Sequence, residues 1–181
     1  AVSRCISKKA RLTVETWRRP PECGLARRRC NSPSARMMTV PERLKVLFLC
    51  TGNSCRSQMA EGWARALKSD QIEAYSAGVE KHGLNPRAVQ VMAEAGVDIS
   101  QHRSQTAEEL GPIPFDLVVT LCDHAQEHCP TWVGAPRVVH HGFDDPPRLA
   151  QGATDEKAQL FPYRRVRDEL RRWVESLPEG A

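Results

Sequence analysis

Two side chains of complementary chemistry, the thiol of Cys50 and the guanidinium of Arg56, stand six positions apart in the stretch KVLFLCTGNSCRSQMAEGW. An apolar run ends at the cysteine, and a helical pattern begins at Ser57. The turn between them would direct backbone N–H groups at one point, and the dipole of the following helix favours a negative charge there. Arg56 adds a planar fork for two oxygens of a tetrahedral anion, and the same positive field favours the thiolate form of Cys50. The spacing therefore predicts a nucleophilic cysteine at the base of an oxyanion-binding loop.

The whole turn is expected to take part in binding the oxyanion. Its residues are Thr51, Gly52, Asn53, Ser54, Cys55, Arg56 and Ser57. Gly52 and Asn53 are the residues best suited to a positive φ. Cys55 can simply pack within the loop, and we assign its thiol no catalytic role. The alternative is a buried cysteine after a strand with a surface arginine, but the glycine, asparagine, serine and helix start around them favour a site.

Two further cysteines, Cys122 and Cys129, lie in VVTLCDHAQEHCP, where a second apolar run ends. Cys122 is expected at the same edge of the sheet as Cys50. The pair could be two resolving thiols that remove a disulfide from Cys50 by thiol–disulfide exchange, or two inert buried thiols. A third possibility is a zinc site made with His124 and His128, with His140 and His141 downstream. The spacing lacks the paired Cys-x2-Cys or His-x3–5-His pattern of zinc sites. We therefore favour the resolving thiols and expect no metal.

An aspartate at a proline follows the fourth predicted strand, in HGFDDPPR. Asp145 precedes Pro146, which predicts a rigid, extended loop. A carboxyl beside an oxyanion pocket can protonate a departing oxygen. The alternative for Asp145 is a surface Asp-Pro turn.

The elements that must position these groups alternate between strands and helices. Strands are predicted over 44–49, 72–76, 115–121 and 137–140, and helices over 57–68, 85–96, 106–110 and 155–177. Met59, Trp63, Ala66 and Leu67 can share one face of the first helix, and Pro162 is a candidate interruption of the last. Asn85 and Gly96 suit the two ends of the second helix. The alternation predicts an α/β three-layer sandwich with a four-stranded parallel sheet, whose ligands bind beyond the carboxyl ends of the strands.

Composition separates a basic extension, residues 1–38, from a domain spanning 39–181. Residues 1–36 hold ten Lys or Arg and two acidic residues, whereas the rest of the 181-residue chain carries a net charge of −4. We expect the extension to be disordered. It could be a transit peptide, a nucleic-acid-binding arm or translated upstream sequence, and a start at Met37 or Met38 is favoured.

Two further features of the sequence bear on where the protein works. No apolar run approaches the ~18 residues of a membrane span. Seven cysteines in a chain that shows no secretory signal indicate catalysis or metal binding rather than a disulfide framework. We expect a cytoplasmic protein.

Four motifs together resemble the thioredoxin-coupled arsenate reductases, which share the fold of the low-molecular-weight protein tyrosine phosphatases. The motifs are LCTGNSCRSQMAEGW, SAGVEKHGLNP, DLVVTLCDHAQEHCP and GFDDPPRLAQG, and the resemblance covers residues 44–174. It implies that Cys50 is the nucleophile, Arg56 and the 51–57 backbone the oxyanion site, and Asp145 the general acid. It also implies that Cys122 and then Cys129 relay a disulfide to thioredoxin.

The resemblance further implies a substrate and partners. Arsenate would be reduced to arsenite for arsenic detoxification, phosphate or sulfate would compete for the site, and thioredoxin would supply reducing equivalents with no bound cofactor. The enzyme is expected to be a monomer without a nucleic-acid partner.

One departure from the family concerns potassium, which some members bind beside the loop. Asn53, Glu61 and Ser76 match that site, but Gln105 stands where an aspartate is expected. We therefore do not expect stabilisation by potassium.

Two other functions stay open at this point. One is a phosphatase of the same fold, although DDPPR lacks the aromatic residue that follows Asp-Pro in the tyrosine phosphatases. The other is a non-catalytic oxyanion or redox sensor whose basic extension contacts nucleic acid.

Overall fold

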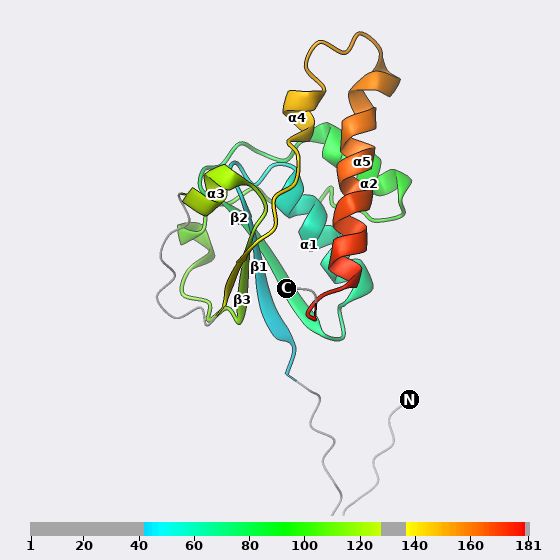
Figure 1. Ribbon diagram of the computed structural model, residues 1–181. Helices are drawn as coiled ribbons and strands as arrows, with labels where there is room; N and C mark the ends of the chain where they lie inside the picture. The colour runs from blue at the N-terminus through cyan, green and yellow to red at the C-terminus, as the bar shows by residue number, and fades with distance from the viewer. Residues whose placement is uncertain (1–41, 128–136, 180–181) are drawn as a thin grey trace, which may run out of the picture. The chain divides into compact units, whose positions relative to one another are not determined.

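The computed structural model describes residues 42–127 and 137–179 (Figure 1). The extension, Cys129 and the predicted boundary between residues 38 and 39 lie outside this part of the chain. None of the helices in these two ranges is long and apolar enough to cross a bilayer.

A four-stranded parallel sheet forms the centre of the fold, in the order β2-β1-β3-β4. The strands are β1 Leu44–Cys50, β2 Ile72–Gly78, β3 Leu117–Thr120 and β4 Val138–His140. The predicted sheet is confirmed, although β3 begins two residues later than expected. Because all strands are parallel, their carboxyl ends meet at one edge.

Helices cover both faces of the sheet. They are α1 Arg56–Leu67, α2 Pro86–Glu94, α3 Asp123–Glu127, α4 Pro146–Leu149 and α5 Glu156–Glu175, with a 3-10 turn at Glu108–Leu110. Figure 1 shows α1, α2 and α5 on one side of the sheet and α3 on the other.

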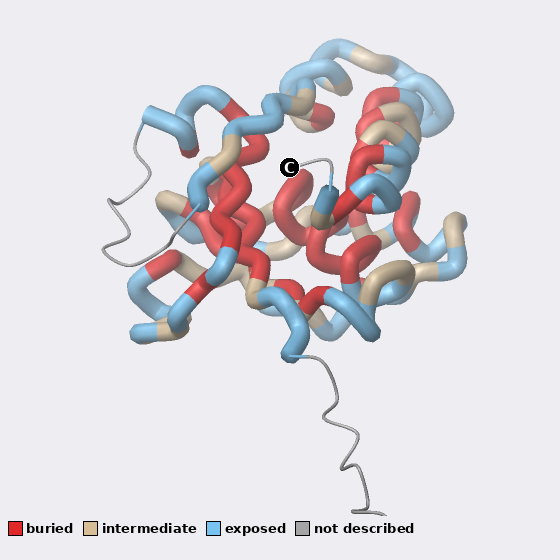
Figure 2. The backbone as a smooth tube through the Cα atoms, turned by 60° about the horizontal axis from the view of Figure 1, so that its bottom comes forward, coloured by how far each residue is buried: buried red, intermediate tan, exposed pale blue. Residues whose placement is uncertain are grey.

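The sequence of the central strand β1 is apolar without alternation because both of its faces are buried. Val46 and Phe48 pack into the core cluster beneath α1 and α5, whereas Leu47 and Leu49 pack into the cluster on the opposite face. A strand with helices on both sides must bury both sets of side chains. Figure 2 shows the resulting buried stretches along the strands and on the inner sides of the helices.

The predicted face of α1 is partly wrong. Met59 and Trp63 are buried as expected, but Ala66 is exposed. Ala60 and Ala64, one residue after each of the two large side chains, complete the buried stripe.

The last helix, predicted over 155–177, is slightly shorter than expected but more regular. α5 runs through Pro162 without a break, so the predicted interruption does not occur. Proline removes one backbone donor, and the buried side chains of Leu160, Tyr163, Val166 and Leu170 hold the helix against the core on either side of it.

Two short helices were not predicted. α3 directly follows Cys122, and α4 begins at Pro146. Asp145 itself is extended (φ −88°, ψ 104°), as expected before proline, but the loop predicted after it is a helical turn capped by the Asp145 side chain.

Candidate active site

The predicted nucleophile lies at the carboxyl end of β1, and the predicted oxyanion arginine begins α1. Cys50 is 3% exposed, and its Sγ lies 2.9 Å from Oγ of Ser57. Asn53 donates from Nδ2 to the same Ser57 oxygen (2.9 Å). The Ser57 hydroxyl hydrogen is therefore free to point at Cys50, where it can stabilise a thiolate.

The backbone of the loop is turned so that its carbonyls face away from the site. Residues of the 79–85 segment donate to them in four places: Val79 N to Cys50 O (3.2 Å), Glu80 N to Thr51 O (2.9 Å), His82 N to Gly52 O (3.0 Å) and Asn85 N to Ser54 O (3.1 Å). Within the described residues, the N–H groups of 51–55 donate to no protein acceptor. Unpaired amide groups in such a turn form an anion-binding nest.

Asn53 holds the loop in shape. Its φ is +43°, the left-handed conformation that asparagine tolerates well. Its Oδ1 accepts from Gln105 N (2.8 Å) and Gln58 Nε2 (2.9 Å), and its Nδ2 also donates to Ser76 Oγ (2.9 Å).

Gly52 serves a different purpose from the one expected. It does not adopt a positive φ. Instead, a Cβ at this position would lie 2.3 Å from Nδ1 of His82, so the glycine is needed for the close approach of that imidazole.

Arg56 links the loop to the segment that carries the predicted general acid. Nη1 donates to the Phe143 carbonyl (3.0 Å), and Nη2 pairs with Oδ1 of Asp145 (3.0 Å). Nε of Arg56 is buried and has no hydrogen-bond partner in the part of the chain that the structure describes. A buried donor without a partner is costly, and an oxyanion held by the loop would satisfy it.

These groups line a pocket of about 240 Å³, which is small enough to suit a tetrahedral anion. Its walls are Cys50, Thr51, Gly52, Ser54, Cys55, Arg56, His82, Asp145 and Pro147. A second pocket of about 490 Å³ shares Thr51, Arg56 and Asp145 with the first and includes Cys122.

The structure brings the first predicted relay thiol to the same site. Cys122 is 7% exposed, and its Sγ lies 3.4 Å from Oγ1 of Thr51, the residue after the nucleophile. Cys50 and Cys122 are both free thiols. Cys129 and His128 lie outside the described residues. Within those residues, no three His, Cys, Asp or Glu side chains gather as a metal site would require.

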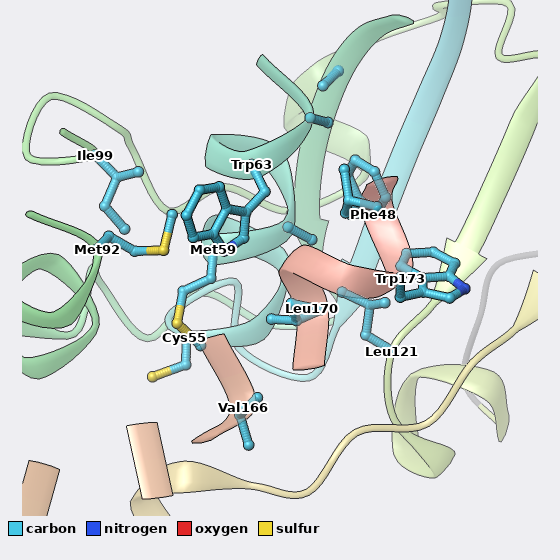
Figure 3. Close-up of a cluster of buried hydrophobic side chains, with 14 of the residues drawn as sticks. Phe48, Cys55, Met59, Trp63, Met92, Ile99, Leu121, Val166, Leu170 and Trp173 are labelled. Carbon is cyan, nitrogen blue, oxygen red and sulfur yellow. The ribbon is translucent and has the colours of Figure 1, made fainter. Parts of the chain in front are cut away.

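The environment of Cys55 differs from that of the other two thiols. Its side chain lies in the apolar cluster near Met59 and Val166 (Figure 3). Burial raises the pKa of Cys55 far above its ordinary value, and the nearby Cys50 raises it further. Cys55 therefore stays protonated and is a poor nucleophile.

The residues that match the potassium site of some relatives do not fit a resident cation here. Gln105 donates from Nε2 to the Ser76 carbonyl (3.1 Å), and its amide brings no negative charge to the cluster. Ser76 Oγ donates to Glu61 (2.5 Å), and Arg65 pairs with the same carboxylate and balances its charge. Asn53 also presents its N–H donors to this cluster. The cluster is held together by internal hydrogen bonds and the arginine.

Comparisons with known proteins agree with this geometry. Residues 45–179 match the family described as low molecular weight phosphotyrosine protein phosphatase. The chain is 52% identical over 125 residues to the arsenate reductase of Bacillus subtilis, which covers 69% of this chain and 88% of that protein. It is 49% identical over 134 residues to the arsenate reductase of Halalkalibacterium halodurans, covering 74% and 94%.

Solved structures show the same relationship. An arsenate reductase in the phosphate-binding state superposes with a TM-score of 0.62 at 34% identity, over 74% of this chain and 95% of that one. A low molecular weight protein tyrosine phosphatase from T. tengcongensis superposes with a TM-score of 0.59 at 30% identity, over 76% and 99%.

Proposed function

The chain belongs to the low molecular weight phosphotyrosine protein phosphatase family, and from that premise we propose that it is an arsenate reductase. The observation that carries the proposal is the Cys122 thiol, 3.4 Å from the hydroxyl of Thr51 and beside the nucleophile loop. Hydrolysis has no use for a second thiol at this place, whereas reduction needs a donor of two electrons.

The first step uses the parts that a phosphatase would also use. Arsenate is a tetrahedral oxyanion, and the free amide groups of the loop and Nε of Arg56 would bind its oxygens. The Cys50 thiolate attacks arsenic, an S–As bond forms, and an arsenate oxygen leaves as water. Asp145, held over the pocket by Arg56, is the group placed to give that oxygen its proton.

The second step is the reduction. The Cys122 thiolate attacks the Cys50 sulfur, a Cys50–Cys122 bond forms, and the electron pair of the S–As bond goes to arsenic. Arsenic passes from the +5 to the +3 state and leaves as arsenite. Cys129 then attacks Cys122, which releases the Cys50 thiolate and leaves a Cys122–Cys129 disulfide.

Thioredoxin is proposed as the dithiol that reduces this last disulfide. No bound cofactor is then needed, because each turnover draws its two electrons from that protein. Reduced thiols of this kind are maintained in the cytoplasm, where we place the enzyme, as a monomer with arsenate as substrate and phosphate or sulfate as competitors. We assign catalysis to residues 39–181, since the family match begins at residue 45.

The second candidate is a phosphatase of the same family. Cys50, Arg56 and Asp145 would suffice for hydrolysis of a phosphate ester. Pro147 lines the pocket directly after the Asp-Pro pair, so no aromatic wall for a phosphotyrosine ring stands there.

The test is arsenate-dependent oxidation of NADPH in the presence of thioredoxin and its reductase, with disulfide mapping by mass spectrometry after one turnover without reductant. The wild type should consume NADPH and show the Cys122–Cys129 bond. Cys122→Ser should release no arsenite, and Cys129→Ser should release it once and then stop with a Cys50–Cys122 bond. A wild type that stays reduced while it hydrolyses aryl phosphates rapidly would establish the phosphatase instead.

A further inference from the structure

The relay thiol Cys122 lies in a short turn, residues 120–123, which we call the Cys122 turn. It joins the end of β3 to the start of α3. The backbone that follows β4 runs along it: His141 N donates to Thr120 O (2.9 Å), and Phe143 N donates to Leu121 O (3.0 Å). The position of the turn therefore depends on residues 140–143.

One side chain of this segment contacts both ends of the Cys122 turn. Nδ1 of His140 lies 2.9 Å from the Thr120 hydroxyl, and its Nε2 lies 3.4 Å from a carboxylate oxygen of Asp123. Because the imidazole ring is rigid, the two contacts fix the ends of the turn relative to each other. Thr120 is buried, whereas Asp123 is 89% exposed, so the Thr120 contact is expected to be the stronger of the two.

The same run of chain continues to the oxyanion arginine. The Phe143 carbonyl accepts from Nη1 of Arg56, and Asp145 pairs with Nη2. Residues 140–145 therefore connect the guanidinium that would hold the oxyanion to the turn that carries Cys122. His140 itself does not line the pocket of Cys50.

We propose that His140 is a positioning residue for Cys122, which sets the direction from which this thiol approaches Cys50. The inference rests on the proposed function, in which Cys122 attacks the Cys50 sulfur. Such an attack needs the two sulfurs aligned, and a misplacement of about 1 Å can cost up to ~100-fold in rate. The first step needs only the loop, Arg56 and Asp145, so it does not depend on His140.

The first experiment measures this alignment without arsenate. In a Cys129→Ser background, diamide takes two electrons and two protons from a pair of thiols, and mass spectrometry follows the Cys50–Cys122 bond. His140→Ala should slow its formation by about tenfold. Hydrolysis of p-nitrophenyl phosphate, which needs Cys50 but not Cys122, should stay near the wild-type rate.

Conservative variants separate the two contacts. His140→Asn places an amide close to the position of Nδ1 and keeps the bond to Thr120, so it should restore most of the rate. His140→Gln places its amide near Nε2 and should restore less. Thr120→Val should give most of the slowing seen with His140→Ala, and the double variant should be no slower than His140→Ala, because the contact with Thr120 is already lost in that variant.

The neighbouring histidine provides the matched control. The ring of His141 stacks on Trp173 (centroids 5.0 Å apart), and among the described residues its side chain makes no hydrogen bond or ion pair with the Cys122 turn. His141→Leu should therefore leave the diamide rate unchanged.

The outcomes decide between positioning and a merely structural role. The inference is wrong if His140→Ala forms the Cys50–Cys122 bond as fast as the wild type or faster, or if disulfide formation and ester hydrolysis fall by the same factor. Selective slowing with rescue by His140→Asn supports it. A wild type that forms the bond with diamide but releases no arsenite would contradict the proposed function, and the rates of the His140 variants would still decide this inference.

Discussion

Replacing Asn53 with alanine should weaken both the fold and the oxyanion loop. The side chain is fully buried and makes four hydrogen bonds of 2.8–2.9 Å, to Ser57, Ser76, Gln58 and the backbone N–H of Gln105. A buried hydrogen bond contributes about 1 kcal/mol net. Alanine at the observed φ of +43° costs roughly 1 kcal/mol more.

Some hydrogen-bond partners of Asn53 would keep their other hydrogen bonds in the variant, which sets the lower end of the expected loss in free energy of unfolding. Gln58 Nε2 still reaches the backbone oxygens of residues 53 and 103, and Ser76 still donates to Glu61. The Gln105 N–H would lose its acceptor. We therefore expect Asn53→Ala to lower the free energy of unfolding by about 3–5 kcal/mol, and Asn53→Gly by roughly 1 kcal/mol less, because glycine adopts a positive φ without strain.

Equilibrium unfolding in urea measures both variants against the wild type, and p-nitrophenyl phosphate hydrolysis at a temperature where all three are folded reports on the loop. Hydrolysis should fall in both variants, since Asn53 orients the Ser57 hydroxyl toward Cys50. A loss below about 1 kcal/mol for Asn53→Gly would refute the hydrogen-bond reasoning. Equal losses for glycine and alanine would refute the conformational part.

Three further predictions concern other parts of the chain. Cys55→Ala should retain ester hydrolysis, and iodoacetamide should modify Cys50 well before Cys55 in the native wild type, because burial raises the pKa of Cys55; early alkylation of Cys55 would contradict this. Removing residues 1–37, so that the chain begins at Met38, should shift the melting temperature by less than ~5 °C and leave turnover unchanged, as calorimetry and the NADPH assay would show. Burial lowers the pKa of His102 below its ordinary 6.5 in the folded protein. The imidazole therefore takes up a proton more readily in the unfolded chain, and the contribution of His102 to stability is lost as pH falls below about 6.5. His102→Gln should therefore lose less stability than the wild type between about pH 7 and pH 5 in urea titrations, and parallel curves would contradict the assignment.

The strands and helices that position the site could be predicted from the sequence, because each of them is marked by a local pattern of residues. An apolar run that ends at Cys50 and another that ends at Cys122 predict two buried parallel strands, and parallel strands bring their carboxyl ends to one edge. Asn85 followed by a proline, and a glycine at position 96, mark the ends of α2. These signals require no knowledge of distant contacts.

The features that the sequence analysis does not predict depend mostly on contacts between distant parts of the chain. Nothing in TGNSC shows that His82 packs on Gly52, and nothing near Cys122 shows that His140 spans its turn. The exception is α4, which has a local signal in the sequence: Asp145 is a suitable N-cap, and the two prolines after it suit the first turn of a helix. The spacing of apolar residues in α1 predicts a buried Ala66 that the structure exposes, because this spacing alone does not fix the rotation of the helix against its neighbours.

The burial of Cys50 and Cys122 gives a reason why the proposed reductase would need a third cysteine. Cys50 and Cys122 are 3% and 7% exposed, so a protein dithiol could not reach a bond between them without opening the site. Thiol–disulfide exchange requires access of the attacking sulfur to the disulfide, and two adjoining pockets of about 240 and 490 Å³ lie beside Cys50 and Cys122. Pockets of that size admit an oxyanion but not the surface of a folded partner. We therefore propose that the electrons enter through a further thiol of this chain, Cys129.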